Sequence, residues 1–152
     1  MSGVSLLRDT SQRMTEESTT PDLVELTHQV FVAATNEDLD ATTAHLAPDA
    51  ALEMGDVLGP LEGLAAIRAF LTEWWSMWED HHHYVEEILD LGHGVVYAVI
   101  REDGRVKGSA EQVEARLAHV ILWIDGLIVR DTAYASIDEA RAAAERLAES
   151  RG

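Results

Sequence analysis

An Asp125-Gly126 pair separates two long apolar runs in the last third of the chain. Asp-Gly between apolar segments is the strongest short-range signal for a β-hairpin, because both residues tolerate the positive φ angles of a two-residue turn. The sequence therefore predicts strands over 113–124 and 127–135, preceded by another strand over 94–102. Polar residues interrupt these apolar runs at positions that can share one face. A sheet that is apolar on both faces, with a few inward polar groups, is typical of a pocket wall.

Helices dominate the chain before this meander. Apolar residues recur at helical spacing after Thr20-Pro21-Asp22, where a hydroxyl cap and an early proline favour a helix start. The other expected elements are a short helix after Asn36 that ends before Pro48, a strand over 50–54, a loop over 55–63, a helix over 64–78, a strand over 84–89 and a helix over 138–147 capped by Ser136. No repeat or linker divides the sequence. We therefore predict a flexible N-terminal tail over 1–20 and a single α+β domain over 21–149.

Composition excludes several classes of function. The 152 residues carry a formal net charge of -17, which repels phosphate backbones and anionic membranes, so neither nucleic acid nor a membrane is an expected partner. The chain contains no cysteine, which excludes disulfides and thiolate chemistry. No apolar run approaches the roughly 20 residues that span a bilayer, and the first residues lack the pattern of a signal peptide. We therefore expect a cytoplasmic protein.

Four segments, in their order and spacing, resemble the SnoaL-like family of the nuclear transport factor 2-like superfamily. They are 31–40 (FVAATNEDLD), 45–50 (HLAPDA), 63–71 (GLAAIRAFL) and 125–134 (DGLIVRDTAY). The resemblance implies a cystatin-like α+β fold, in which a cone-shaped, curved, antiparallel or mixed sheet wraps around a pocket with N-terminal helices. It also implies a small apolar ligand and a homodimer formed through the outer face of the sheet. Family members include polyketide cyclases, steroid isomerases, epoxide hydrolases, dehydratases and non-catalytic binding modules, so function must be argued from the site.

Strand alternation sorts the meander into two faces. The family likeness places one face in the pocket, and with it the polar residues Glu102, His119 and Asp131. The apolar residues that we expect to line the pocket are Val30, Met54, Trp74, Ala98, Ile100, Leu117, Ile121, Val129 and Ala133. Tyr97 and Tyr134 fall on the opposite face, where we expect them to serve the dimer surface. Trp74, Trp75 and Trp78 as a group are typical of a core or an interface rather than a cofactor site.

Two known chemistries of the family are disfavoured by the residues that align with their catalytic groups. A steroid isomerase needs a tyrosine, a base and a protonated acid at positions that here hold Val30, Met54 and His119. An epoxide hydrolase needs a Tyr/Asn pair and an Asp-Arg-Asp arrangement; the corresponding positions hold Leu52, Met54, Glu102, Ile100 and Ala133. The arginine and one carboxylate of that arrangement are missing.

What remains is acid–base chemistry. A cyclase of this type needs one acid–base group beside an acidic carbon, and a His119–Asp131 pair assisted by Glu102 could move that proton, because imidazole titrates near neutrality. The structural alternative is a hydrogen-bonded core histidine, with Asp131 near the strand end or in an ion pair with Arg130 or Arg116.

Three functions therefore stay open. The protein is a cofactor-free cyclase, isomerase or lyase acting on a polyketide- or steroid-like substrate, a non-catalytic ligand-binding module, or a dimerisation domain. The apolar residues at catalytic positions of the family favour the second.

The run His81-His82-His83 is the remaining conspicuous motif. In a strand only His81 and His83 share a face, and a metal site would need a further ligand, which Glu79, Asp80 or His93 could supply. The spacing matches no known metal motif. We therefore expect a solvated turn leading into a strand, with no metal; the alternative is a single one of these histidines at the mouth of the pocket.

Overall fold

The computed structural model describes residues 22–54 and 58–152. The expected tail, the residues Thr20 and Pro21, and the first part of the expected loop lie outside these ranges. The described elements are α2 (Leu23–Thr35), α3 (Leu39–Thr43), β1 (Leu46–Met54), β2 (Leu58–Glu62), α4 (Leu64–Ser76), β3 (Trp78–Gly92), β4 (Val95–Val106), β5 (Gln112–Ile124), β6 (Leu127–Tyr134) and α5 (Ile137–Arg151). None of the described helices is long and apolar enough to cross a membrane.

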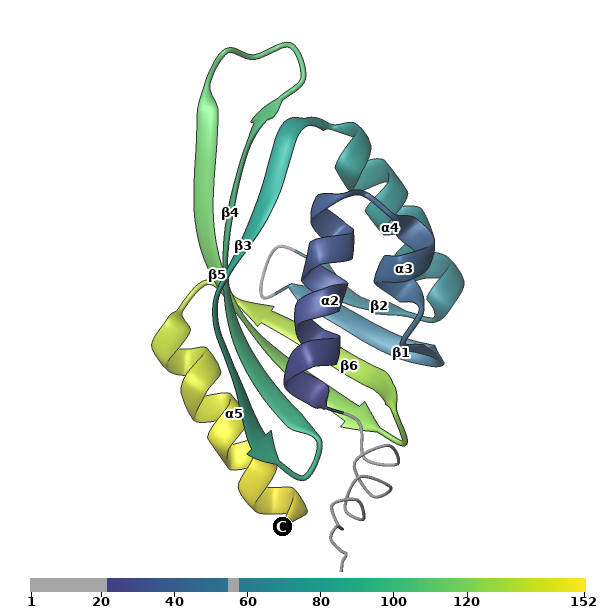
Figure 1. Cartoon of the computed structure of the whole chain (residues 1–152), viewed down its shortest axis with the longest axis vertical. Coiled ribbons are helices and arrows are strands. Elements are labelled where there is room, and N and C mark those ends of the chain that lie inside the picture. Colours follow the sequence, from purple (N-terminus) through teal and green to yellow (C-terminus); the bar gives the residue numbers. More distant parts are fainter. Residues whose placement is uncertain (1–21, 55–57) are drawn as a thin grey trace, which may run out of the picture.

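The strands form one curved, open, mixed sheet in the order β2-β1-β6-β5-β4-β3. β1 and β6 run parallel, and every other neighbouring pair is antiparallel. Helices α2, α3 and α4 lie on one side of this sheet and α5 lies on the other (Figure 1). The α+β fold with a curved mixed sheet and N-terminal helices is therefore confirmed.

The predicted hairpin and its Asp-Gly turn are confirmed. Asp125 and Gly126 both have positive φ angles, 53° and 80°, as a two-residue hairpin turn requires. Ile124 then pairs with Leu127 and Trp123 with Ile128, but the register shifts by one residue before Leu122, which pairs with Arg130. Because side chains alternate along each strand, the turn and this shift together decide which polar groups of the two strands face the same way.

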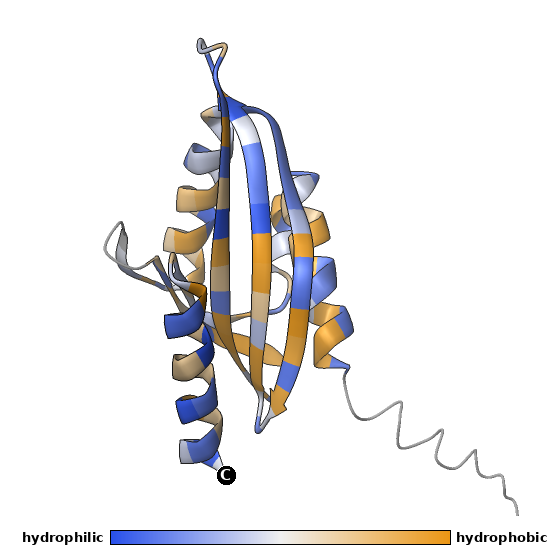
Figure 2. Cartoon of the chain, turned by 90° about the vertical axis from the view of Figure 1, so that its left-hand side faces the viewer, coloured by the Kyte–Doolittle hydropathy of each residue, from blue (hydrophilic) through white to orange (hydrophobic). Residues whose placement is uncertain are grey.

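Each face of the sheet has its own apolar core. Val96, Ala98 and Ile100 of β4 pack against Phe31 of α2 on one face. The alternate residues Val95, Tyr97 and Val99 pack beneath α5 on the other. Alanines at positions 140, 144 and 148 let α5 approach the sheet closely, and Ser136 caps this helix as expected by accepting from the Glu139 N–H. The strands turn hydrophilic toward the β4–β5 turn, beyond this covered region (Figure 2), and Gln112 to Arg116 are exposed.

The expected role of Tyr97 at a dimer surface is wrong. Its side chain is buried under α5, with the guanidinium of Arg141 5.5 Å from the ring centroid. Tyr134 is partly buried against the same cluster. Because α5 covers this part of the outer face, a dimer through the sheet would have to use the part of that face that α5 leaves uncovered.

Several expected boundaries near β1 are also wrong. Pro48 lies inside β1 instead of ending a helix, and residues 58–62 form β2 instead of a loop. Proline cannot donate to a strand ladder, and the β1–β6 pairing is accordingly irregular between Leu46 and Ala51. The first helix begins after Asp22, whose carboxylate accepts from the Glu25 N–H. These differences lengthen the sheet at the edge that carries Met54.

A buried hydrogen bond joins α2 to the sheet and supplies a test of the packing. The indole N–H of Trp123 donates to Thr27 Oγ1 at 3.2 Å, and both residues are buried. We expect Thr27→Val to lower the free energy of unfolding by about 1–3 kcal/mol, because the indole N–H loses its partner. The exposed hydroxyl of Thr72, which donates to the Arg68 carbonyl, supplies the control. Thr72→Val should change stability by less than about 0.5 kcal/mol in the same urea titration; equal effects would contradict the burial argument.

Candidate functional site

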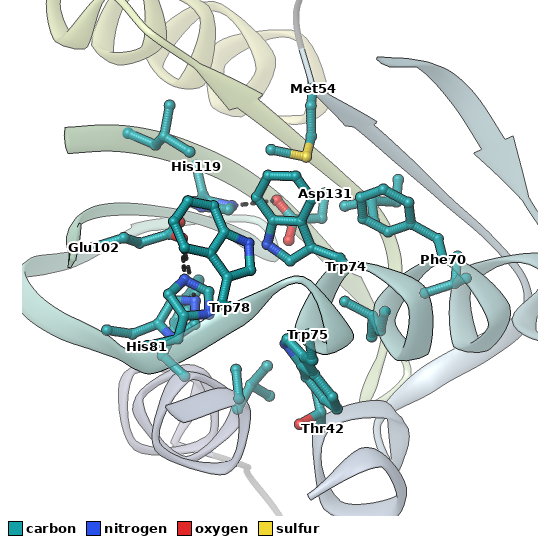
Figure 3. A pocket seen from close by; sticks show the side chains of 18 of the residues that line it. Thr42, Met54, Phe70, Trp74, Trp75, Trp78, His81, Glu102, His119 and Asp131 are labelled. Carbon is teal, nitrogen blue, oxygen red and sulfur yellow. Dashed lines mark hydrogen bonds and ion pairs between the residues drawn. The ribbon is translucent and has the colours of Figure 1, made fainter. Parts of the chain in front are cut away.

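A cavity of about 390 Å³ is lined by residues of α2, α3, α4 and five of the strands. This volume is in the range of pockets that hold small organic molecules. Aromatic rings form much of one wall: Phe70 and Trp74 stack with centroids 6.0 Å apart, and Trp74 lies 5.5 Å from Trp78 (Figure 3). The tryptophans expected in a core or interface therefore line the cavity. They do so because α4 turns its apolar face toward the sheet and β3 begins directly after it.

His119 and Asp131 lie side by side on the cavity wall (Figure 3). His119 pairs with Ala133 and Asp131 with Ile121, so the two residues are diagonal neighbours on β5 and β6. The Nδ1–H of His119 donates to Asp131 Oδ1 at 2.8 Å. The hairpin turn and a one-residue register shift between Trp123 and Leu122 together bring these two groups onto one face. Without the extra residue in β6, Asp131 would pair with Val120 and face away from His119.

Asp131 does not form the ion pairs that the structural alternative required. Arg130 pairs with Glu53 at 3.0 Å, and Arg116 pairs with Glu86 at 2.8 Å. The carboxylate of Asp131 therefore has His119 as its charged partner among the described residues.

The electrostatics of His119 favour its charged form. Burial alone would lower the pKa of this imidazole, but the negative charges of Asp131 and, secondarily, Glu102 outweigh burial and raise the pKa above 6.5. The other ring nitrogen, Nε2, is buried and has no hydrogen-bond partner among the described residues. Phe31 packs against the ring with its centroid 5.0 Å away. Nε2 is therefore the nitrogen of His119 that remains for proton transfer.

Glu102 belongs to a second polar group on the same wall, with His81 and His83. His83 is the cross-strand partner of Glu102 in the β3–β4 ladder. The N–H at His81 Nε2 donates to Glu102 Oε1 at 3.1 Å, and His83 Nε2 lies 3.5 Å from the same oxygen. Thr35 Oγ1 lies 3.3 Å from the other ring nitrogen of His83. Two imidazoles and one carboxylate therefore converge on one point.

The expectation of a solvated turn at 81–83 is wrong. These residues lie inside β3, and His81 is buried. The register shifts between Glu79 and His82, where Asp80 has a positive φ of 53°, so β3 contains one extra residue there. This bulge lets Trp78, His81 and His83 all line the cavity. On β4, Gly104 lies against the bulge and leaves room for Trp78 and His81, which a Cβ would meet at 3.2 Å.

The protonation states of this second group differ from those of free side chains. Burial lowers the pKa of His83 to about 4, against the opposing charge of Glu102, so its ring is neutral near pH 7. Burial would raise the pKa of Glu102, but the hydrogen bond from His81 and the neighbouring imidazoles lower it overall. Glu102 therefore stays ionised although it is largely enclosed.

The expected lining residues divide into two sets. Val30, Met54, Trp74 and Leu117 line the cavity, as do the three polar residues expected there. Ala98, Ile100 and Ile121 are packed in the core with Phe31, Ala133 is buried, and Val129 packs against the core around Ala50 and Ile67; none of the five lines the cavity. The cause is Phe31, which fills the concave face over the middle of β4. The helical spacing around Val30 does not show how far Phe31 fills the concave face. The sequence therefore could not separate the residues that line the cavity from those packed in the core.

Comparison with known proteins establishes the family. A family model described as a SnoaL-like domain matches residues 27–131. The chain belongs to the SnoaL-like family. A search of curated proteins gives no significant match to this SnoaL-like chain.

Solved structures similar to this SnoaL-like protein share its fold at low sequence identity. A putative SnoaL-like polyketide cyclase from Jannaschia sp. CCS1 is 16% identical, with a TM-score of 0.66 over 80% of this chain and 90% of that one. A protein of ketosteroid isomerase-like fold from Catenulispora acidiphila, solved with trimethylamine, is 18% identical, with a TM-score of 0.67 over 76% and 86%. An epoxide hydrolase-like protein from M. tuberculosis is 16% identical, with a TM-score of 0.64 over 81% and 89%. These likenesses confirm a nuclear transport factor 2-like fold, and the chemistry must come from the site.

Proposed function

We propose that this SnoaL-like protein binds a flat, apolar, polyketide- or steroid-like molecule and moves a proton on it, as a cofactor-independent cyclase, isomerase or lyase does. The observation that carries the proposal is the 2.8 Å hydrogen bond between His119 and Asp131 on the wall of the cavity. In this arrangement Asp131 orients the ring and stabilises its charged form, while Nε2 takes or gives the proton. Glu102 assists by adding a second negative charge near the ring.

The cavity wall favours a flat, aromatic or polycyclic ligand. The rings of Phe70, Trp74 and Trp78 offer faces against which fused rings can pack, and aromatic contacts add to the effect of apolar burial. The polar groups belong to the sheet side of the same cavity, with His119 on β5 and Asp131 on β6, whereas Phe70 and Trp74 come from α4 (Figure 3). A ligand held by the rings would thus present one edge to the imidazole.

A non-catalytic binding module is the second candidate. The covered position of His119 Nε2 favours it, because a general base must come within hydrogen-bond distance of the proton that it removes. The apolar side chains of Val30 and Met54 favour it too, since they replace polar groups of catalytic relatives. Both candidates use the same cavity, and they differ in whether the bound molecule exchanges a proton.

A simple carbon acid separates the two candidates. 2-Tetralone is a flat aromatic ketone whose acidic C–H exchanges with D₂O, and NMR follows this exchange. We expect the protein to accelerate the exchange above the buffer rate, with saturation at the same concentrations that quench tryptophan fluorescence, because three of the four tryptophans line the cavity. Saturable quenching without faster exchange would contradict the catalytic function and support the binding module.

A further inference from the structure

The triad His81, His83 and Glu102 has the composition and spacing of a metal site, and we propose that it binds a divalent transition-metal ion such as Zn²⁺ or Co²⁺. One donor atom from each residue can be chosen so that all three lie within 4.8 Å of one another. The site uses two other histidines than the acid–base pair His119 and Asp131, shares only Glu102 with the proposed function, and is tested by metal binding without any turnover.

The distances between the donor atoms match the geometry of a coordinated ion. Glu102 Oε1 lies 3.1 Å from His81 Nε2 and 3.5 Å from His83 Nε2. Two ligands that are each about 2.1 Å from a tetrahedral ion lie about 3.4 Å apart, so small adjustments would place an ion in contact with all three atoms. Three protein ligands leave the remaining coordination positions for water or for a ligand in the cavity. This is the arrangement of an open site rather than a closed structural one.

The chemistry of the donors selects the class of ion. Imidazole nitrogens suit zinc, cobalt, nickel and iron, whereas calcium and magnesium prefer a shell of oxygens. Asp103 also lines the cavity, but it pairs with Arg101 at 3.2 Å and lies 3.5 Å from His82 on the outer side. The donor set is therefore two imidazoles and one carboxylate.

The surroundings of the two histidines support the assignment. Metal-binding histidines are commonly oriented by a partner on the second ring nitrogen, and Thr35 Oγ1 lies 3.3 Å from His83 Nδ1. His81 is held by its ring stacking on Trp78, with centroids 5.0 Å apart, yet its Nδ1 is buried without a partner among the described residues. With Nε2 as the ligand atom, the ring of His81 is therefore oriented by stacking on Trp78, whereas His83 is oriented by Thr35.

Cobalt titration of the EDTA-treated protein tests the proposal. We expect saturable binding of one Co²⁺ per chain, seen as visible absorption bands and as quenching of tryptophan fluorescence, because Trp78 stacks on a ligand. Binding should persist in excess Mg²⁺, which removes weak association with the acidic surface. Absence of saturable Co²⁺ and Zn²⁺ binding, or its loss in Mg²⁺, would overturn the proposal.

Matched variants locate the ion. His83→Ala should weaken binding by more than about 100-fold, beyond the 10–100-fold effect of outer partners. His82→Ala is the control, because His82 lies on the same strand with a side chain that is 48% exposed on the other face, and it should bind normally. His119→Gln should also bind normally. Equal losses in His82→Ala and His83→Ala, or a loss only in His119→Gln, would contradict the assigned ligands.

Imidazole NMR keeps the test valid if a variant fails to fold. On addition of Zn²⁺ to the wild-type protein, the ring ¹⁵N signals of two histidines should shift in slow exchange while those of His28, His45, His82 and His93 stay in place. Shifts confined to those four would overturn the proposal.

Discussion

Replacing Gly94 by alanine should lower the free energy of unfolding by about 2–5 kcal/mol, the sum of backbone strain and overpacking. Gly94 has a φ of +84°, a region that L-residues with a side chain rarely adopt. A Cβ at this position would overlap the carbonyl oxygen of Trp123, which is main chain and cannot rotate away. The Gly94 carbonyl also accepts from the Trp123 N–H at 2.8 Å, so the strands cannot separate without losing this bond. Urea unfolding followed by circular dichroism measures the loss.

Gly126→Ala is the matched control. Gly126 has a nearly equal φ of +80° in the neighbouring hairpin, but nothing lies within 4 Å of a Cβ built there. This variant should lose about 1–2 kcal/mol, the strain alone. Equal losses in the two variants would mean that the close approach of β4 to Trp123 is unimportant.

Asp131→Asn should slow proton exchange on 2-tetralone by about 10²–10⁴-fold, the usual contribution of general acid–base catalysis. The amide cannot stabilise the imidazolium that forms when His119 takes the proton. The pKa of His119 should also fall, because burial is then opposed by Glu102 alone. Imidazole NMR measures this pKa, and tryptophan quenching verifies that the ligand still binds.

The same variant should change how stability depends on pH. Because the folded pKa of His119 lies above 6.5, the pair stabilises the wild type fully below about pH 6.5, and this contribution is lost as pH rises through the folded pKa. The stability difference between wild type and Asp131→Asn should therefore be larger at pH 6 than at pH 9.

Glu53→Gln, which removes a carboxylate paired with Arg130 at the surface, should leave both exchange and the pKa of His119 unchanged. If Asp131→Asn retains full exchange activity, the pair is not catalytic.

Much of the fold could be predicted from local signals. Asp125-Gly126 defined the hairpin and so placed His119 and Asp131 on neighbouring strands, whereas their common face also depends on the extra residue in β6 between Ile128 and Arg130. The N-terminal helix followed from its apolar spacing, although its cap is Asp22, and the start of α5 followed from the cap at Ser136. In each case a short segment determines its own conformation without help from distant residues.

The parts that could not be predicted depend on tertiary packing. A run of three histidines does not disclose that Asp80 adopts a positive φ, so the alternation across 78–83 could not be assigned. Pro48 reads as a helix end, but it occupies an irregular part of a strand because β6 pairs on both sides of it. The depth of the cavity depends on Phe31, whose ring covers Ile100 from another element. Tyr97 was misplaced because the sequence does not indicate which face α5 covers.

The bulge at Asp80 also affects how the chain can tolerate changes in length. Asp80 and His81 together lie opposite Gly104 of β4, and Trp78 and His81, on either side of Asp80, both face inward. Deleting Asp80 would leave Trp78, His81 and His83 in regular alternation, still on the cavity side. Deleting His82 instead would turn one of the two imidazoles to the outside. Deleting Asp80 thus keeps both imidazoles in the cavity, whereas deleting His82 removes one of them. Among relatives of this protein we therefore expect length variation in this strand at the position of Asp80.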